Sequence, residues 1–270
     1  MSRDPLTIIA EVLGEPADQM RNPVNAGYQC PFINSVCTKR SQRMQGSYPV
    51  CSIYRKTIQH CVCPKRFYQA DLVADVLAHC WAGTPPTAPQ VAYEVQMKGF
   101  GMVDLVIADI DATNTVRSFV SVELQAVDIT GSVEPAYQAL LGNAQVEGKI
   151  SYGLNWANVR KRYVSQLISK GFYHHHWGSK IVSVLQEPLY AQFRHYIPFD
   201  ELDPKAGTSN VVFMLYDFQD DPDRGAPHRR LTFTRAIGTS HNSLMTGALY
   251  RTPPDRAVFC QRILERLNGA

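Results

Sequence analysis

The chain has 270 residues, of which 45% are hydrophobic and 19% are charged, and its formal net charge is +3. This composition is typical of a folded globular protein and excludes an intrinsically disordered chain or a collagen-like repeat. No run of about eighteen apolar residues occurs, so we expect no membrane span. Acidic residues among the first 16 positions argue against a signal peptide, and we expect a cytoplasmic protein.

The first predicted elements are two helices separated by an irregular segment. Asp4 as a cap and Pro5 at the first helical position predict a short helix at residues 4–14. Residues 19–66 have little hydrophobic periodicity and hold five of the seven cysteines. The apolar spacing over residues 67–81 then predicts a second helix.

Three strands are predicted next, at residues 91–97, 102–110 and 117–125. The turn-forming sequence DATNT joins the last two strands, which allows them to pair in antiparallel fashion. A helix predicted at residues 132–146 is expected to pack on this sheet.

The second half of the chain adds elements of both kinds. Asn155 can cap a helix at residues 156–170, and Gly171 is expected to stop that helix. The remaining elements are two strands and a last helix, at residues 180–186, 210–218 and 255–267. This order of strands and helices predicts an α/β protein, and no internal repeat is found.

Basic residues are distributed unevenly along the chain. Three segments contain no Asp or Glu, at residues 19–70, 148–186 and 224–254, and they hold 19 of the 27 Lys and Arg residues. A single basic run is usually a solvated face. Three long acid-free segments in a nearly neutral chain favour a surface that binds a polyanion, and nucleic acid is the first candidate.

The second and third predicted strands carry acidic residues inside apolar runs. Alternation places Asp104 on one face of its strand, and places Glu123 and Gln125 together on one face of the next. Neighbouring strands lie about 4.8 Å apart, so an antiparallel pair would bring the two carboxylates together. Such a pair repels unless a cation lies between its members, and Mg²⁺ meets that need. The alternative is that these acids face solvent or pair with a nearby base.

Cysteines form a second group of candidate ligands. Five of them fall within 34 residues of the irregular segment: Cys30, Cys37, Cys51, Cys61 and Cys63. A bound metal could replace the hydrophobic core that this segment lacks, and four sulfur ligands suit either zinc or iron. Five candidates for four positions leave one cysteine out, and buried free thiols remain the alternative.

Histidines and arginines complete the candidate residues. The HHHW sequence at residues 174–177 is predicted to be a loop or strand end near DNA, because three consecutive histidines cannot all face one metal site. Arginine is the side chain best suited to read guanine. The candidate DNA-binding arginines are Arg40, Arg43, Arg160, Arg162, Arg229, Arg230 and Arg235. Half or more of these are expected to contact phosphate only.

The acidic strands resemble a known nuclease arrangement. One Asp on a strand, followed by Glu123-Leu124-Gln125 on the next, is similar to the PD-(D/E)XK motif, with Gln125 where Lys is usual. Other segments resemble signatures of the NotI family of type II restriction endonucleases: CPF at 30–32, CTK at 37–39, VCSI at 50–53, CPKRF at 63–67, VELQAVDITG at 122–131, YGLNWANV at 152–159 and VLQEPLY at 184–190.

The resemblance implies both a fold and an activity. The fold would be an α/β PD-(D/E)XK core at residues 67–270, with a mixed central sheet flanked by helices. An N-terminal helix and a four-cysteine metal-binding segment would form residues 1–66. The activity would be Mg²⁺-dependent hydrolysis of double-stranded DNA by a homodimer at a short GC-rich palindrome, which in turn requires a companion DNA methyltransferase to protect the host genome.

The resemblance also implies roles for individual residues. Asp104, Glu123 and Gln125 would be catalytic, and the two acids would hold Mg²⁺. The family motifs select Cys30, Cys37, Cys51 and Cys63 as ligands of a structural iron or zinc ion, with Cys61 as an alternative ligand. Gln125 could orient water but could not act as a base.

Three alternatives stay open from the residues alone. Glu94, on the strand before Asp104, is either a further acidic ligand or a surface charge. The protein could also be another metal-dependent DNA nuclease of this fold, used in repair or element mobility. A further alternative is a metal-containing DNA-binding protein without enzymatic activity.

Overall fold

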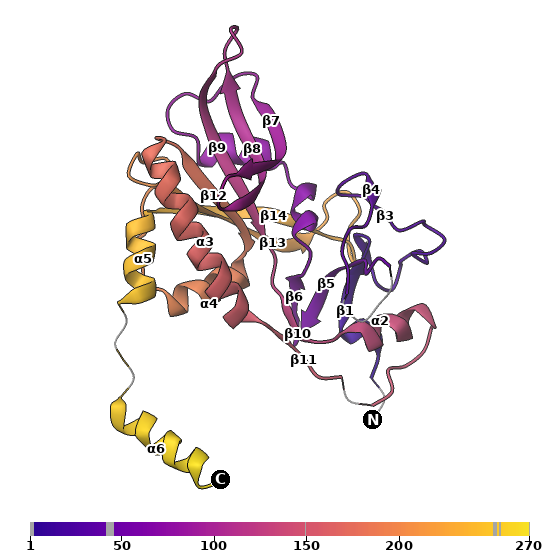
Figure 1. The fold of residues 1–270 in the computed structure, drawn as a ribbon. Coiled ribbons are helices and arrows are strands. Elements are labelled where there is room, and N and C mark those ends of the chain that lie inside the picture. The colour runs from indigo at the N-terminus through magenta and orange to yellow at the C-terminus, as the bar shows by residue number, and fades with distance from the viewer. Residues whose placement is uncertain (1–2, 42–45, 149, 251–252, 254, 270) are drawn as a thin grey trace.

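The computed structural model describes residues 3–41, 46–148, 150–250, 253 and 255–269 (Figure 1). A six-stranded mixed sheet in the order β14-β13-β12-β9-β8-β7 forms its centre. The strands are β7 (Gln90–Met97), β8 (Gly101–Ile110), β9 (Val116–Gln125), β12 (Lys180–Gln186), β13 (Val211–Asp220) and β14 (Arg229–Thr239). Strand β12 runs parallel to β9 and β13, and the other neighbouring pairs are antiparallel.

Helices cover both faces of this sheet. On one face, η2 (Pro64–Gln69) and α1 (Leu72–His79) pack on Val122 and its neighbours in an apolar core. The other face is covered by α3 (Trp156–His176) and α4 (Glu187–Tyr196), with α5 (His241–Leu249) beside α3 (Figure 1). All residues of β12 are buried, as expected for a central strand with helices on both sides.

A second, smaller sheet lies in the N-terminal part of the chain (Figure 1). It is antiparallel, has the order β2-β1-β5-β6, and consists of β1 (Ile9–Val12), β2 (Glu15–Pro16), β5 (Val50–Arg55) and β6 (Ile58–Cys61). Gly14 makes the tight turn between β1 and β2 with φ +78°, and a Cβ there would lie 2.6 Å from the ring of Phe32. Only glycine therefore fits this position without a shift of Phe32.

Short elements surround the smaller sheet. They are η1 (Pro5–Thr7), the β3 (Gln29–Cys30) and β4 (Ser35–Val36) hairpin, the β10 (Ile129–Gly131) and β11 (Tyr152–Leu154) hairpin, and α2 (Glu134–Leu141). Helix α2 packs here and not on the six-stranded sheet, with Tyr137 in edge contact with Tyr48. The expectation that the helix at 132–146 covers the main sheet was therefore wrong.

The predicted N-terminal helix was also wrong beyond its first turn. Asp4 does cap a helical turn that begins at Pro5, but this turn is η1 and ends at Thr7. The residues that follow form β1, and all four residues of this strand are buried. A short apolar run does not distinguish a buried strand from a buried helix. Here the residues form a strand because they pair with the neighbouring strand β5.

Most later elements agree with the sequence prediction. The predicted strands at 91–97, 102–110, 117–125, 180–186 and 210–218 correspond to β7, β8, β9, β12 and β13. The last helix, α6 (Arg256–Leu267), is capped by Asp255. Helices α4 and α5 and strand β14 were not predicted from the sequence. Strand β14 is half exposed and rich in Arg and Thr, so it lacks the apolar run that marks a central strand.

Helix α3 is longer than predicted. It continues through Gly171 and the histidine run to His176. A Cβ at Gly171 would lie 2.7 Å from the side chain of Val211, so this glycine allows the helix to approach β13 closely. Its role is packing and not termination. No helix among the described residues is long and apolar enough to cross a membrane.

We expect the protein to lose stability as pH falls from 7 toward 5. Burial lowers the pKa of His60 and of His174 to about 4. The unfolded chain, with histidine pKa values near 6.5, binds more protons in this range, so the stabilising effect is complete above about pH 6.5 and is lost toward pH 4. Thermal melting at a series of pH values measures this. His174→Gln should make the melting temperature depend less on pH, whereas replacement of the exposed His195 with Gln should leave the dependence unchanged. A parent melting temperature that stays constant from pH 7 to 5 would contradict the account.

Candidate active site

Two carboxylates lie side by side on the neighbouring strands β8 and β9. The antiparallel register pairs Leu105 with Val122, which sets Asp104 opposite Glu123. Oδ2 of Asp104 accepts a hydrogen bond from the backbone N–H of Leu124 at 2.8 Å, so β9 itself holds this carboxylate in place. The structure thus brings together the two acids that strand alternation predicted as neighbours.

Lys170 of α3 lies against this pair of acids. Its Nζ donates hydrogen bonds to the Glu123 carboxylate and, at 3.0 Å, to the backbone oxygen of Met102. The side chains of Lys170 and Glu123 are only 3% and 12% exposed. Burial raises the pKa of Glu123, the contact with Lys170 opposes this shift, and the charge of Asp104 adds to it. Sequence reasoning gave Lys170 no role, although its spacing from Leu167 places it on the buried side of α3.

Gln125 lies at the edge of the sheet face that carries Asp104 and Glu123. Its side-chain amide donates a hydrogen bond to the backbone oxygen of Ala126. It also lines a cavity of about 190 Å³ between β9 and the N-terminal half of α3, together with Asp128, Asn158, Val159, Arg162, Tyr163 and Gln166. The amide of Gln125 is therefore close to open space, whereas the Glu123 carboxylate is largely enclosed.

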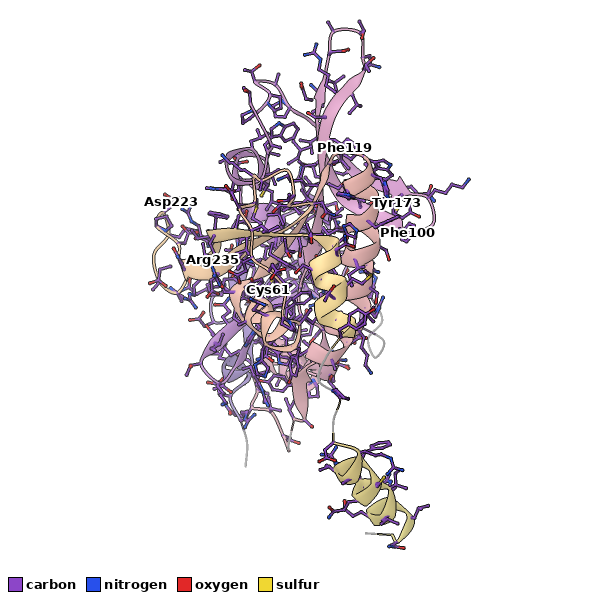
Figure 2. The ribbon with its side chains drawn as sticks, turned by 90° about the vertical axis from the view of Figure 1, so that its left-hand side faces the viewer. Cys61, Phe100, Phe119, Tyr173, Asp223 and Arg235 are labelled. Carbon is purple, nitrogen blue, oxygen red and sulfur yellow. The ribbon has the colours of Figure 1, made fainter. Side chains whose placement is uncertain are left out.

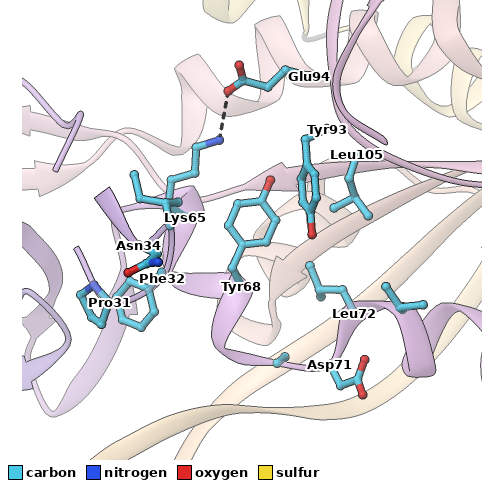
Figure 3. A pocket seen from close by; sticks show the side chains of 13 residues that line it. Pro31, Phe32, Asn34, Lys65, Tyr68, Asp71, Leu72, Tyr93, Glu94 and Leu105 are labelled. Carbon is cyan, nitrogen blue, oxygen red and sulfur yellow. Dashed lines mark hydrogen bonds and ion pairs between the residues drawn. The ribbon is translucent and has the colours of Figure 1, made fainter. Parts of the chain in front are cut away.

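Glu94 lies on the strand next to Asp104 but faces elsewhere. The flanking register pairs of β7 and β8 place it opposite Asp104, and it has a left-handed backbone with φ 53°. Its exposed carboxylate points to Lys65, 3.5 Å away, beside a cavity of about 610 Å³ that Tyr68 and Tyr93 help to line (Figure 3). Glu94 is thus an exposed charge that pairs with Lys65, and of its two predicted roles the described contacts favour the surface charge.

Asp104 and Glu123 suit a hard divalent cation. Both offer carboxylate oxygens from adjacent strands, and Mg²⁺ is commonly held by one or two carboxylates, with water and phosphate oxygens as its other ligands. No group of three or more His, Cys, Asp or Glu side chains in the described part of the chain is placed to hold a metal. A site made by these two acids alone would therefore depend on water and substrate oxygens.

Comparison with known families decides the class of the protein. The family model described as "Restriction endonuclease NotI" matches residues 15–229, a span that includes the paired acids and the N-terminal cysteines. The chain belongs to the NotI restriction endonuclease family. A NotI-family member is an enzyme, a site-specific deoxyribonuclease of type II that cleaves DNA. None of the curated proteins compared with the chain matches it.

The N-terminal cysteines of this NotI-family enzyme are buried in and around the smaller sheet. Burial raises the pKa of the Cys37 and Cys51 thiols, and the neighbouring Cys63 adds to both shifts. The amine of Lys39 lies in the same region and donates to the backbone oxygen of Val50 at 2.6 Å. Burial lowers the pKa of Lys39, while the charges of Cys63 and Cys51 oppose that shift. These thiols are therefore near neighbours, although the described residues do not form a closed metal site.

Cys61 packs in a different core from Cys30 and Cys37. It ends β6 and packs in the core between the six-stranded sheet and α1, whereas Cys30 and Cys37 pack in the other core. Its Sγ contacts the backbone oxygen of Cys63 at 3.2 Å. Cys63 itself precedes η2 and lies outside the strand, so the two side chains do not follow one strand face.

Two candidate DNA-binding arginines of the NotI-family enzyme line surface hollows that share Asp128. Arg162 is exposed on α3 and lines the cavity beside Gln125. Arg40 donates to the backbone oxygen of Cys37 at 2.8 Å and borders a second hollow of about 330 Å³. Asp128 lines both hollows.

The arginines of β14 lie at the far edge of the main sheet. Each is paired with an acid, in the pairs Arg229 with Asp220 at 3.6 Å, Arg230 with Asp223 at 3.8 Å, and Arg235 with Glu187 at 2.9 Å. Strands β12 and β13 separate them from β9. Arg43 and the side chain of Arg160 lie outside the described residues.

The histidine run forms the last turn of α3, so the prediction of a loop or strand end was wrong. His174 is fully buried, and its Nδ1 lies 2.7 Å from the backbone oxygen of Lys170. Its ring packs against Phe119 and Trp177. His174 is thus a packing residue of the helix that carries Lys170.

Proposed function

We propose that the protein is a Mg²⁺-dependent restriction endonuclease that cuts both strands of DNA at a short GC-rich palindrome. Asp104, Glu123 and Gln125 are its catalytic residues in this proposal. The observation that carries it is the placement of Asp104 opposite Glu123 on β8 and β9, within a chain of the NotI family.

The two acids and the amide have different tasks in this mechanism. Asp104 and Glu123 would hold Mg²⁺, which when bound offsets charge on the scissile phosphate and acidifies water. The Leu124 N–H holds one oxygen of Asp104 through a hydrogen bond of 2.8 Å. Gln125 turns its amide from the Ala126 oxygen toward the attacking water and orients it. Since an amide cannot accept the proton, the proton passes to a phosphate oxygen of the substrate.

Digestion of plasmid DNA tests this function. With Mg²⁺ the protein should give a discrete set of bands, and with a chelator it should give none. A smear in place of bands would indicate a nuclease of the same fold that cuts by structure. DNA that is bound but left intact in Mg²⁺ would indicate a DNA-binding protein without this activity.

We also propose a structural iron or zinc ion held by Cys30, Cys37, Cys51 and Cys63. The burial of these thiols supports this choice, and the packing of Cys61 in a different core from Cys30 and Cys37 supports its exclusion. Sulfur ligands suit either metal.

We expect purified protein to carry about one iron or zinc ion per chain, retained when Mg²⁺ is removed by mild chelation. Serine at any of the four positions should lower thermal stability and metal content, because folding of this segment is coupled to binding. Cys61→Ser and Cys80→Ser, which alter buried thiols outside the proposed set, are the controls. Elemental analysis that finds no transition metal would reject the ion.

The path of DNA in this proposal follows the two hollows that Gln125 and Arg40 line. Arg162 lies beside it, and Arg43 and Arg160 are close to these residues in sequence. The three arginines of β14 would have to exchange their acidic partners for phosphate, so we expect them to contribute less. Binding should weaken steeply with salt in proportion to the phosphates neutralised.

We propose a homodimer, because a palindromic cut is made most simply by a two-fold assembly with one site on each strand. We divide each chain into an N-terminal segment at residues 1–66 and a nuclease core at residues 67–270. Such an enzyme works in the cytoplasm beside a methyltransferase of the same specificity, since unprotected sites in the host genome would otherwise be cut.

A further inference from the structure

The motif on β9 lacks a positive charge. Position 125, where the nuclease arrangement usually has Lys, holds the neutral amide of Gln125. Two carboxylates together with one Mg²⁺ have no net charge. An incoming phosphate would therefore meet a neutral site, which gives little stabilisation to the negative charge that develops during hydrolysis.

Helix α3 brings an ammonium group to this place. Lys170 Nζ contacts Glu123 on β9 and the backbone oxygen of Met102, two residues before Asp104 on β8. The group therefore bridges the two strands that carry the acids. Within the described part of the chain, Lys170 is the one Lys or Arg that forms an ion pair with either acid.

Lys170 lies on the buried face of its helix. Val159, Tyr163 and Leu167 precede it along the buried face of α3, and His174 follows it. Burying a charge at such a position is unfavourable unless the charge has a partner. The lysine has two acceptors, and one of them is the proposed metal ligand Glu123.

The surrounding residues fix the helix where Lys170 can reach β9. Gly171 allows α3 to approach Val211 closely. At the end of the helix, the ring of Tyr173 packs on Phe100 at 4.8 Å between ring centres, and Phe119 lies nearby (Figure 2). The ammonium is thus held by a rigid element and not by a mobile surface side chain.

We propose that Lys170 is a positioning residue of the active site, which fixes the Glu123 carboxylate and supplies from α3 the positive charge that position 125 lacks. This inference rests on the proposed function of Asp104 and Glu123. Lys170 acts through Glu123 and through its charge, without contact to the substrate. The positive charge thus comes from the helix that covers the strand, and not from the strand itself.

A second buried lysine provides a matched comparison. Lys180 is 5% exposed, and its Nζ donates to the backbone oxygens of Pro204 and Ala206. Its removal changes burial and hydrogen bonding much as removal of Lys170 does, but it leaves the acids untouched.

The test uses the full-length protein with Lys170→Met, Lys180→Met, Glu123→Ala and the double variant Gln125→Lys/Lys170→Met. For each, we measure the Mg²⁺-dependent cleavage rate, the melting temperature and the DNA affinity without Mg²⁺ by fluorescence anisotropy. Lys170→Met should slow cleavage about 10²–10³-fold, with DNA affinity retained. Lys180→Met should lower the melting temperature and leave the cleavage rate unchanged.

The double variant separates a charge role from a packing role. Lysine at position 125 should restore cleavage at least tenfold over Lys170→Met without raising the melting temperature, because residue 125 does not fill the space left on α3. Cleavage by Lys170→Met within threefold of the parent rate would overturn the inference, as would a slow variant that lysine at 125 does not restore. If Glu123→Ala cleaves like the parent, the proposed function fails instead.

Discussion

Replacing Asp104 or Glu123 with alanine should lower the rate of DNA cleavage by at least about a thousandfold. Each change removes one of two carboxylates that face each other across β8 and β9, and no third acid among the described residues can take its place. DNA binding should be retained, since the acids do not attract phosphate. Cleavage assays with excess enzyme, together with anisotropy measurements of binding, check both expectations.

Two companion variants sharpen this prediction. Gln125→Ala should be less severe, about tenfold, because one hydrogen bond to water is lost while both acids remain. Asp109→Ala, on the same strand as Asp104 but on its other face, should cleave at the parent rate. If alanine at 104 or 123 leaves cleavage near the parent rate, the site has been assigned to the wrong residues.

The buried ion pair of Arg66 and Glu11 should have the largest effect on stability. Arg66 is 0% exposed, and its guanidinium donates two hydrogen bonds to the Glu11 carboxylate, at 2.9 and 3.1 Å. It also donates to the backbone oxygen of Arg229, so it joins the smaller sheet to β14. Arg66→Met should cost about 3–5 kcal/mol of the free energy of unfolding, because it leaves the buried Glu11 carboxylate with its hydrogen bond from Ser52 but without its cationic partner.

Thermal and denaturant unfolding measure this cost. The double variant Glu11→Met/Arg66→Met should recover part of the lost stability, since neither charge then stays unpaired. Arg235→Met breaks the exposed pair with Glu187 and should change stability by about 1 kcal/mol or less. Equal losses of unfolding free energy for Arg66→Met and Arg235→Met would show that burial does not increase the contribution of an ion pair to stability.

The sequence was informative where local pattern determines structure. Alternation in β8 and β9, with a turn sequence between them, was enough to predict that Asp104 and Glu123 would lie together. Both features belong to 24 consecutive residues, from Gly101 to Leu124, so no distant contact was needed.

The sequence was not informative where contacts between residues far apart in the chain determine the structure. Gly171 looks like a helix stop, and only its approach to Val211 shows that the helix passes through it. Lys170 and Glu123 are 47 residues apart, and no sequence pattern gives the register of a helix on a sheet. Residues 9–12 could have been helix or strand until β5 paired with them.

Sequencing both strands at the ends of digested DNA tests the central claim most directly. We expect the parent protein with Mg²⁺ to give cuts related by two-fold symmetry within one short GC-rich sequence, and Glu123→Ala to give none. Nicks confined to one strand, ends scattered without symmetry, or the same ends from Glu123→Ala would contradict a dimeric restriction endonuclease that works through these two acids.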